Sequence, residues 1–295
     1  MHGIYRSAAA RREVGRWCAE RLARWPVPHR TMTLSTRVGP THVVAAGEDA
    51  DQRRRTPCVV VVPGTNFNAA TSLPLITALA ARWPTYAVDV PGQPGLSAPE
   101  RPGPNRPTLY GRWLEDVLDA VGTGPTVVVG HSLGGAIALA CEAPRLSGRL
   151  LVSPAGLARL KVTGRVLAAT VPWLICPTNT RSATLLRQMH GPGHGPSAGH
   201  VEWMTLVARS CHSSLAPFPL PKGTLARSRR VANLVVAGEQ DVFLPPSRLT
   251  SPASRHLGVA VITVPGAGHL VVEEEPAAMV ALTAAFMNGD EGSGR

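Results

Sequence analysis

The stretch VVVGHSLGGAIALA, residues 127–140, decides the fold. A run of valines leads into Gly-His-Ser-Leu-Gly, and small apolar residues follow. Gly-x-Ser-x-Gly between a strand and a helix is typical of a sharp turn that exposes its serine, here Ser132. Gly130 and Gly134 lack side chains, so the turn can approach its neighbours closely. The pattern predicts a nucleophilic Ser132, with a serine in an ordinary strand-to-helix connection as the alternative.

Apolar segments on both sides of this stretch predict a sheet. Together with it they make eight strand candidates, and the first two suggest an antiparallel hairpin: TMTLSTRV, THVVAA, CVVVVPG, TYAVDVPG, LSGRLLVSP, VANLVVAGEQD and AVITVPGAGH. Continuous apolar strands that alternate with helical patterns indicate a parallel sheet buried on both faces. The predicted fold class is therefore α/β, with a mostly parallel eight-stranded sheet and helices on both of its faces.

The order of these patterns divides the chain into parts. We expect an N-terminal amphipathic helix in residues 1–30, a core of residues 31–153 and 224–287, a helical lid of residues 154–223 and a disordered tail of residues 288–295. The lid is predicted because no strand candidate occurs between Ser153 and Gly223. Such an insertion would cover the carboxyl edge of the sheet, where open α/β sheets bind ligands.

Composition excludes several classes of protein. The formal charge is +11, but 28 of the 30 basic residues are scattered arginines without a nucleic-acid-binding motif, so we expect no nucleic-acid partner. No apolar stretch approaches the roughly 18 residues of a membrane helix, and no membrane partner is expected. The five cysteines are odd in number and far apart, which favours buried thiols in a reducing compartment and a cytoplasmic location.

Two further residues complete a constellation for nucleophilic catalysis. A serine needs a general base, a group that orients the base, and donors for the oxyanion. His269 lies in a glycine-flanked loop after one late strand, and Asp241 follows the strand before it. In this interpretation His269 takes the proton of Ser132, and Asp241 fixes the tautomer of His269. The alternatives are a surface histidine and a turn-capping Asp241, with Glu239 as the substitute acid.

From residue 31 to 287 the sequence resembles the α/β-hydrolase family. The resemblance is carried by GHSLGG, by VVVVPGTNF at the family's oxyanion strand and loop, by DVPGQPGLS, by GEQDVFLP and by GAGHL. The chain order Ser132, Asp241, His269 is the order of this family. The resemblance implies the α/β-hydrolase fold with an inserted helical lid. Asp89, which ends its strand within DVPGQPGLS, is expected to be structural because the elbow carries serine.

The oxyanion loop departs from the family's commonest wording. Pro63 stands where a histidine usually precedes the glycine, Gly64. By position, the backbone amides of Leu133 and Thr65 form the oxyanion hole, and Asn66 is the neighbouring alternative. The side chains of Thr65 and Asn66 either contact substrate or only hold the loop.

The apolar residues of the lid are candidates for the substrate pocket. We expect Asn66, Trp173, Trp203 and Met204 to bind substrate, with Met189 and Phe218 as further candidates, although any lid residue could equally belong to the lid core. The histidines of HGPGHGPSAGH, residues 190–200, are interrupted by glycine and proline, which indicates a loop rather than a metal site.

The resemblance implies a serine hydrolase that cleaves a carboxylic ester or lactone of a small apolar molecule through a Ser132 acyl-enzyme. Alternatives are a biosynthetic enzyme of the same fold (thioesterase, carbon–carbon hydrolase, cyclase, dehydratase or cofactor-free haloperoxidase) or a ligand-binding receptor with little turnover. The expected partner is a small-molecule ester, lactone or thioester, and a homodimer stays open. No metal and no organic cofactor is implied.

Overall fold

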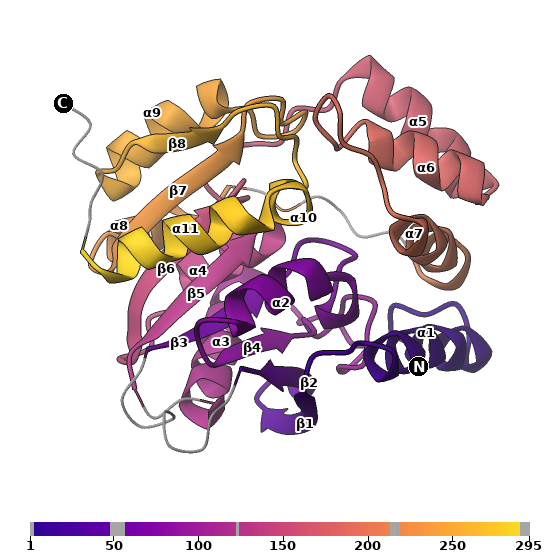
Figure 1. Cartoon of the computed structure of the whole chain (residues 1–295), viewed down its shortest axis with the longest axis horizontal. Coiled ribbons are helices and arrows are strands. Elements are labelled where there is room, and N and C mark those ends of the chain that lie inside the picture. Colours follow the sequence, from indigo (N-terminus) through magenta and orange to yellow (C-terminus); the bar gives the residue numbers. More distant parts are fainter. Residues whose placement is uncertain (1–2, 48–56, 122–123, 213–216, 218, 290–295) are drawn as a thin grey trace.

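The structure is a computed structural model, and it describes residues 3–47, 57–121, 124–212, 217 and 219–289. Figure 1 shows a twisted sheet covered by helices on both faces, with further helices beyond its carboxyl edge. Of the segments considered above, Phe218 and the last six residues of the expected tail lie outside the described residues.

Eight strands form one sheet. They are β1 (His29–Thr36), β2 (Gly39–Ala46), β3 (Cys58–Val62), β4 (Thr85–Val88), β5 (Thr126–His131), β6 (Leu146–Val152), β7 (Ala232–Gly238) and β8 (Val261–Val264). Their spatial order is β1-β2-β4-β3-β5-β6-β7-β8. Strands β4, β3, β5, β6, β7 and β8 pair in parallel, whereas β2 is antiparallel to both β1 and β4. The predicted eight-stranded, mostly parallel sheet and its antiparallel entry hairpin are confirmed.

Helices lie before, between and after the strands. They are α1 (Ala8–Ala23), η1 (Ala69–Thr71), α2 (Leu73–Ala80), α3 (Arg106–Val121), α4 (Leu133–Ala140), α5 (Gly164–Ile175), α6 (Asn179–Arg187), α7 (Ala198–Ser210), α8 (Lys222–Ser228), α9 (Pro246–Leu257), α10 (Val271–Glu274) and α11 (Pro276–Met287).

Strand β3, at the centre of the sheet, is apolar along its whole length because both of its faces are buried. In β3, Val59 and Val61 pack into one core cluster, which includes side chains of α2, α10 and α11. Val60 and Val62 pack into the other cluster, which includes side chains of α3, α4 and α9. Alternate side chains of a strand point to opposite faces, so each valine of β3 is covered by helices on its own side.

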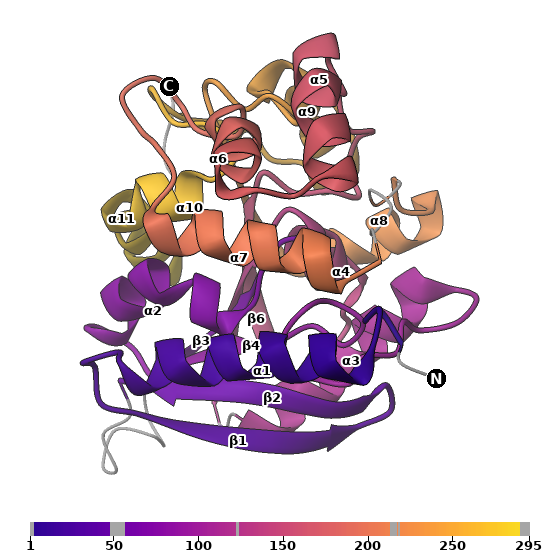
Figure 2. The same cartoon turned by 90° about the vertical axis from the view of Figure 1, so that its right-hand side faces the viewer.

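Three helices, α5 to α7, occupy the chain between β6 and the α8–β7 segment, and they lie beyond the carboxyl edge of the sheet (Figure 1). The N-terminal helix α1 packs alongside α7, as Figure 2 shows. The rings of Trp17 in α1 and Trp203 in α7 are 4.7 Å apart, and Tyr5 pairs with Cys211 in an isolated β-bridge. The first helix of the chain therefore shares a hydrophobic core with the inserted helices.

Two findings complete the description of the fold. Within the described ranges, no helix has the length and apolar character needed to cross a membrane. Cys176 is exposed, whereas Cys18, Cys58, Cys141 and Cys211 are buried.

Candidate active site

Ser132 lies at the turn between β5 and α4. Its φ angle of 50° is positive, a conformation that costs a residue with a side chain about 1–3 kcal/mol. The turn is tight: a Cβ atom on Gly130 would come within 2.6 Å of the Gly134 carbonyl oxygen, and one on Gly134 would collide with the backbone of Val62 in β3. Both positions require glycine, and the result is a serine raised above the carboxyl end of β5.

The structure brings Ser132, His269 and Asp241 together. Nε2 of His269 is 3.2 Å from Oγ of Ser132, and Nδ1 of His269 is 2.9 Å from Oδ2 of Asp241. All three residues are buried, with exposed fractions of 6%, 4% and 3%. They follow β5, β8 and β7, whose parallel pairing places the three loops at one edge. With its proton on Nδ1, His269 donates to Asp241 and can accept the hydroxyl proton of Ser132.

Asp241 is held as a carboxylate. The amides of Phe243 and Leu244 donate to its Oδ1 at 2.8 and 2.9 Å. Burial raises the pKa of this carboxyl group, but the charge and hydrogen bond of His269 and the backbone donor at Leu244 outweigh it and lower the pKa to about 2. The ring of Phe243 meets His269 edge-on at 5.0 Å. Asp241 is therefore ionised at neutral pH, and the imidazole is fixed in orientation.

Two other acidic residues considered in the sequence analysis, Glu239 and Asp89, hydrogen-bond to backbone amides of other segments. Oε2 of Glu239 accepts the amide of Gly266 at 3.0 Å in an exposed position. Asp89 accepts the amides of Ala69 and Leu96 at 2.9 and 2.7 Å, so it joins the loops after β3 and β4. Neither carboxylate contacts His269 through a hydrogen bond that the described residues show, and Asp89 has the structural position expected of it.

His131 is a site residue that the sequence analysis missed. Its Nε2–H donates to the carbonyl oxygen of His269 at 2.8 Å, and the two rings are 5.1 Å apart. Burial, reinforced by the charge of His269, lowers the pKa of His131 to about 3, so this ring is neutral at physiological pH. Gly64 lies against it, since a Cβ atom there would be 3.1 Å from Nδ1 of His131. The only sequence signal was a histidine in the free position of the Ser132 motif.

The loop after β3 passes close to Ser132. A Cβ atom on Gly64 would lie 3.4 Å from Cβ of Ser132. The amide of Asn66 donates to Oε1 of Gln93 at 3.0 Å, and its carbonyl accepts Nε1–H of Trp203 at 2.7 Å. Asn66 is thus occupied with holding the loop, and its φ angle of 67° is positive. Gln93 was not singled out from the sequence, although it lies inside DVPGQPGLS.

A cleft of about 770 Å³ opens beside this loop. Its described lining residues come from the β3 and β4 loops, α3, α4 and the segment before α8: Thr65, Gln93, Arg101, Gly103, Pro104, Asn105, Arg106, Pro107, Tyr110, Leu133, Ala136, Ile137, Pro217, Pro219 and Leu220. Thr65 and Leu133, the residues expected to supply the oxyanion amides, both line it. The cleft has mostly apolar walls, and its charged residues are arginines.

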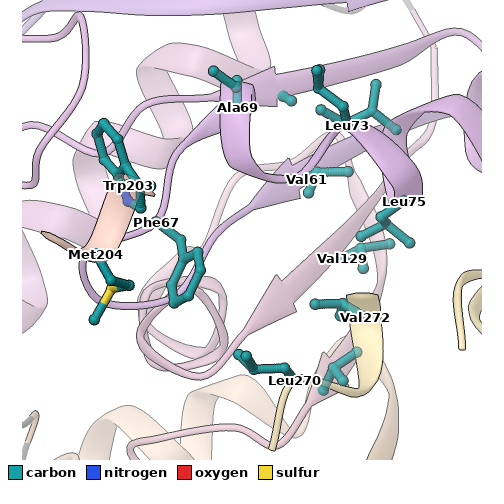
Figure 3. Close-up of a cluster of buried hydrophobic side chains, with 14 of the residues drawn as sticks. Val61, Phe67, Ala69, Leu73, Leu75, Val129, Trp203, Met204, Leu270 and Val272 are labelled. Carbon is teal, nitrogen blue, oxygen red and sulfur yellow. The ribbon is translucent and has the colours of Figure 1, made fainter. Parts of the chain in front are cut away.

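The residues of α5 and α7 that were expected to bind substrate are packed against other side chains and do not line the cleft. Trp203 is fully buried between Trp17 and the loop at Asn66, and Figure 3 shows it beside Phe67 in the core cluster. Nε1–H of Trp173 donates to the carbonyl of Met204 at 3.2 Å, within the lid. Within the described chain, neither these three residues nor Asn66 lines the cleft. Trp173, Trp203 and Met204 are buried against other side chains, and their assignment to the substrate pocket, like that of Asn66, stays a prediction.

The three histidines within residues 190–200 contact three different partners. His190 Nδ1 contacts the carbonyl of Leu186 at 2.9 Å, His194 lies 3.7 Å from Glu275, and His200 donates to the carbonyl of Thr71 at 2.9 Å. The three rings therefore do not converge on one point.

A model of the alpha/beta hydrolase family matches residues 59–282. A Bacillus subtilis protein named uncharacterized carboxylesterase nap is 28% identical over 293 residues, which cover 94% of this chain and 92% of that protein. Carboxylesterase YbfK of the same organism is 27% identical, with 86% of each chain covered.

Solved structures agree on the fold. The crystal structure of naproxen esterase from Bacillus subtilis superimposes with a TM-score of 0.76 at 24% identity, covering 92% of this chain and 96% of that one. The carboxylesterase CesB (YbfK) structure gives 0.75 at 20% identity, with 96% and 99% covered. With the family model matching most of the chain, and the elbow and sheet order in place, the protein belongs to the alpha/beta hydrolase family.

Proposed function

We propose that this protein hydrolyses carboxylic esters of small apolar molecules through an acyl-enzyme on Ser132. The observation that carries the proposal is the buried chain of contacts from Ser132 Oγ through His269 to the ionised Asp241. A hydroxyl group needs this arrangement to lose its proton at neutral pH. The carboxylesterases among the relatives support an ester as the substrate, and the apolar cleft beside Leu133 supports an apolar acyl or alcohol group.

The first half-reaction transfers the acyl group. Oγ of Ser132 attacks the ester carbonyl carbon while its proton moves to Nε2 of His269. The carbonyl oxygen becomes an oxyanion, which the amides of Leu133 and Thr65 stabilise. The carbon–oxygen bond to the alcohol then breaks, and the alcohol leaves with the proton from His269.

The second half-reaction reverses these roles with water. A water molecule attacks the acyl carbon and gives a proton to His269, and Ser132 regains that proton as the carboxylic acid leaves. Asp241 stays ionised throughout and stabilises the imidazolium. His131, which donates to the backbone of His269, holds the base at the height of Ser132.

The test is a hydrolysis screen of p-nitrophenyl esters of graded chain length, beside lactones and thioesters. Turnover should fall by about 10⁶ in Ser132→Ala, as for nucleophile removal in other serine hydrolases. Ser254→Ala, an exposed serine on α9, is the matched control and should keep wild-type rates. Preference for lactones or thioesters over simple esters would redefine the substrate. Activity above a tenth of wild type in folded Ser132→Ala would refute the mechanism.

A further inference from the structure

The lid helix α5 exposes large apolar side chains. Of the residues that the structure describes, the large hydrophobic side chains that are exposed all belong to one segment: Val162 (54%), Leu167 (50%), Val171 (48%), Leu174 (39%) and Ile175 (78%). The same helix buries Val166, Ala169 and Trp173. A helix that is apolar on all sides is normally covered on all sides. We refer to the five exposed side chains together as the α5 face.

The α5 face is continuous. Leu167, Val171, Leu174 and Ile175 are spaced by four, three and one residues, so they share one side of the helix. Val162 is exposed two residues before the helix begins. Figures 1 and 2 both place α5 at the outer edge of the molecule, on the far side of the lid from the sheet. The face is therefore open to a large partner surface.

The charges around the α5 face are all positive along the chain. Residues 143–201 contain no aspartate and no glutamate, and the lid part of this stretch carries five cations: Arg159, Lys161, Arg165, Arg181 and Arg187. Arg165 is in the first turn of α5. Nη1 of Arg181 donates to the carbonyl of Cys176 at 2.8 Å, which holds this guanidinium at the other end of the helix. Cations thus border the apolar stripe at both ends.

We propose that the α5 face docks on the surface of a bilayer that contains anionic phospholipid, which revises the expectation of no membrane partner, because that expectation rested on the absence of a membrane-spanning stretch. Apolar side chains would enter the boundary between headgroups and acyl chains, and the bordering cations would meet the headgroup phosphates. A second copy of the chain is disfavoured as the occupant, because pairing two α5 faces would bring together two sets of cations for which the described residues show no ion pair. Charge complementarity therefore selects an anionic surface.

Co-sedimentation with vesicles tests the proposal without reference to enzymatic activity. The protein should pellet with vesicles of phosphatidylglycerol and phosphatidylcholine, and far less with vesicles of phosphatidylcholine alone. Binding should weaken as salt is raised, because the Debye length falls from about 10 Å at 0.1 M to about 3 Å at 1 M.

Two double variants distinguish the contribution of the apolar side chains to vesicle binding from the contribution of charge. Leu167→Glu combined with Ile175→Glu should lower binding at least tenfold, since each side chain loses apolar burial worth roughly a factor of ten. Thr31→Glu combined with Thr33→Glu adds the same charge to exposed positions of β1, at the opposite end of the molecule from α5 (Figures 1 and 2), and should lower binding by less than about threefold. Unchanged thermal unfolding midpoints verify that both variants fold.

Three results would overturn the proposal. Wild-type protein that pellets no better with anionic than with zwitterionic vesicles would exclude anionic docking. Equal losses in the two double variants would show that charge alone, not the α5 face, carries the binding. A dimer in analytical ultracentrifugation that the Leu167→Glu, Ile175→Glu variant dissociates, with no vesicle binding, would assign the face to a second copy.

Discussion

Burial sets what each side chain around Ser132 can do. Asp241 keeps its negative charge because its hydrogen bonds and the neighbouring His269 outweigh desolvation, and its pKa is lowered to about 2. His131, fully enclosed, is neutral because burial lowers its pKa to about 3. The acid that faces the base is thus charged, whereas the second histidine is an uncharged donor to the backbone.

Replacement of Asp241 by asparagine tests this assignment. The amide keeps the shape of the side chain but favours the wrong tautomer of His269, so kcat should fall by about 10⁴. Steady-state hydrolysis of a p-nitrophenyl ester measures the effect.

Glu239→Gln is the matched control, because among the described residues the carboxylate of Glu239 accepts a hydrogen bond from the amide of Gly266 and makes none to His269. It should keep kcat within a few-fold of wild type. A dead Glu239→Gln beside an active Asp241→Asn would mean that the acid has been misassigned.

The sequence singled out Ser132, Asp241 and His269 because each follows an apolar strand and carries a side chain suited to its role, and the structure places the three side chains within contact distance. It did not reveal His131 or Gln93. His131 acts on the carbonyl of His269, 138 positions away, and Gln93 on the amide of Asn66, 27 positions away. Both partners are backbone atoms, which leave no signature in a sequence.

At the level of elements, helix α7 supports the loop after β3. Trp203 packs between α1 and this loop, and its indole N–H donates to the carbonyl of Asn66 at 2.7 Å. Gln93, from the loop after β4, accepts the amide of the same residue at 3.0 Å. The loop that presents Thr65 is therefore held from two sides by elements distant in sequence.

Trp203→Phe should loosen the loop and leave the part-buried carbonyl of Asn66 without its donor, at a cost of about 1 kcal/mol of stability. We expect kcat to fall for every acyl chain length by a similar factor, because the oxyanion amides serve all substrates equally. Kinetics on short and long p-nitrophenyl esters test this expectation.

Trp173→Phe is the comparison, since Trp173 bonds to Met204 inside the lid. It should lower stability without an equal loss in kcat. A chain-length-dependent change of KM in Trp203→Phe would return that residue to the substrate pocket.

Helices α5 to α7 show what apolar spacing in a sequence does not specify. Apolar residues at helical spacing indicate burial, but they do not say whether a ligand or another helix covers them. Here Trp203 is covered by Trp17 of α1, an element some 180 positions earlier in the chain. The cleft is instead lined in part by a proline- and glycine-containing loop at residues 101–105, which has no periodic pattern.

At the scale of the whole molecule, a buried ionisable pair joins α10 to α7. Oε2 of Glu273 in α10 is 3.6 Å from Nε2 of His200 in α7, and Arg21 of α1 lies near enough to act on both. Burial raises the pKa of Glu273 to about 8, only partly offset by the charge of Arg21. Burial also lowers the pKa of His200. The pair is therefore neutral at pH 7.

This pair makes stability depend on pH. Between pH 4.5 and about 8 the folded chain keeps the Glu273 proton, which the unfolded chain releases. The contribution of Glu273 to the free energy of unfolding is fully present below pH 4.5. It decreases as the pH rises toward about 8, by up to about 1.4 kcal/mol per pH unit. In urea denaturation, the free energy of unfolding of Glu273→Gln should increase relative to that of wild type from pH 5 to pH 8.

The exposed Glu202→Gln controls for loss of a carboxylate, and its difference from wild type should stay flat over the same range. A Glu273→Gln variant whose stability follows the wild type in parallel at every pH would show that Glu273 is ionised in the fold.

The overall architecture was largely predictable. Long apolar strands between helical patterns permit few arrangements other than a parallel sheet covered on both faces. What the sequence does not contain is the spatial order in which β2 pairs with β4, or the packing of α1 against α7, because both depend on contacts between distant elements.

The central claim is that Ser132 becomes acylated during turnover. A fluorophosphonate probe that reacts with activated serines, followed by intact-protein and peptide mass spectrometry, tests it most directly. We predict one adduct per chain on the peptide that contains GHSLGG, present in Ser254→Ala and absent in Ser132→Ala. No adduct on active wild-type protein, or an adduct that persists in folded Ser132→Ala, would contradict the account.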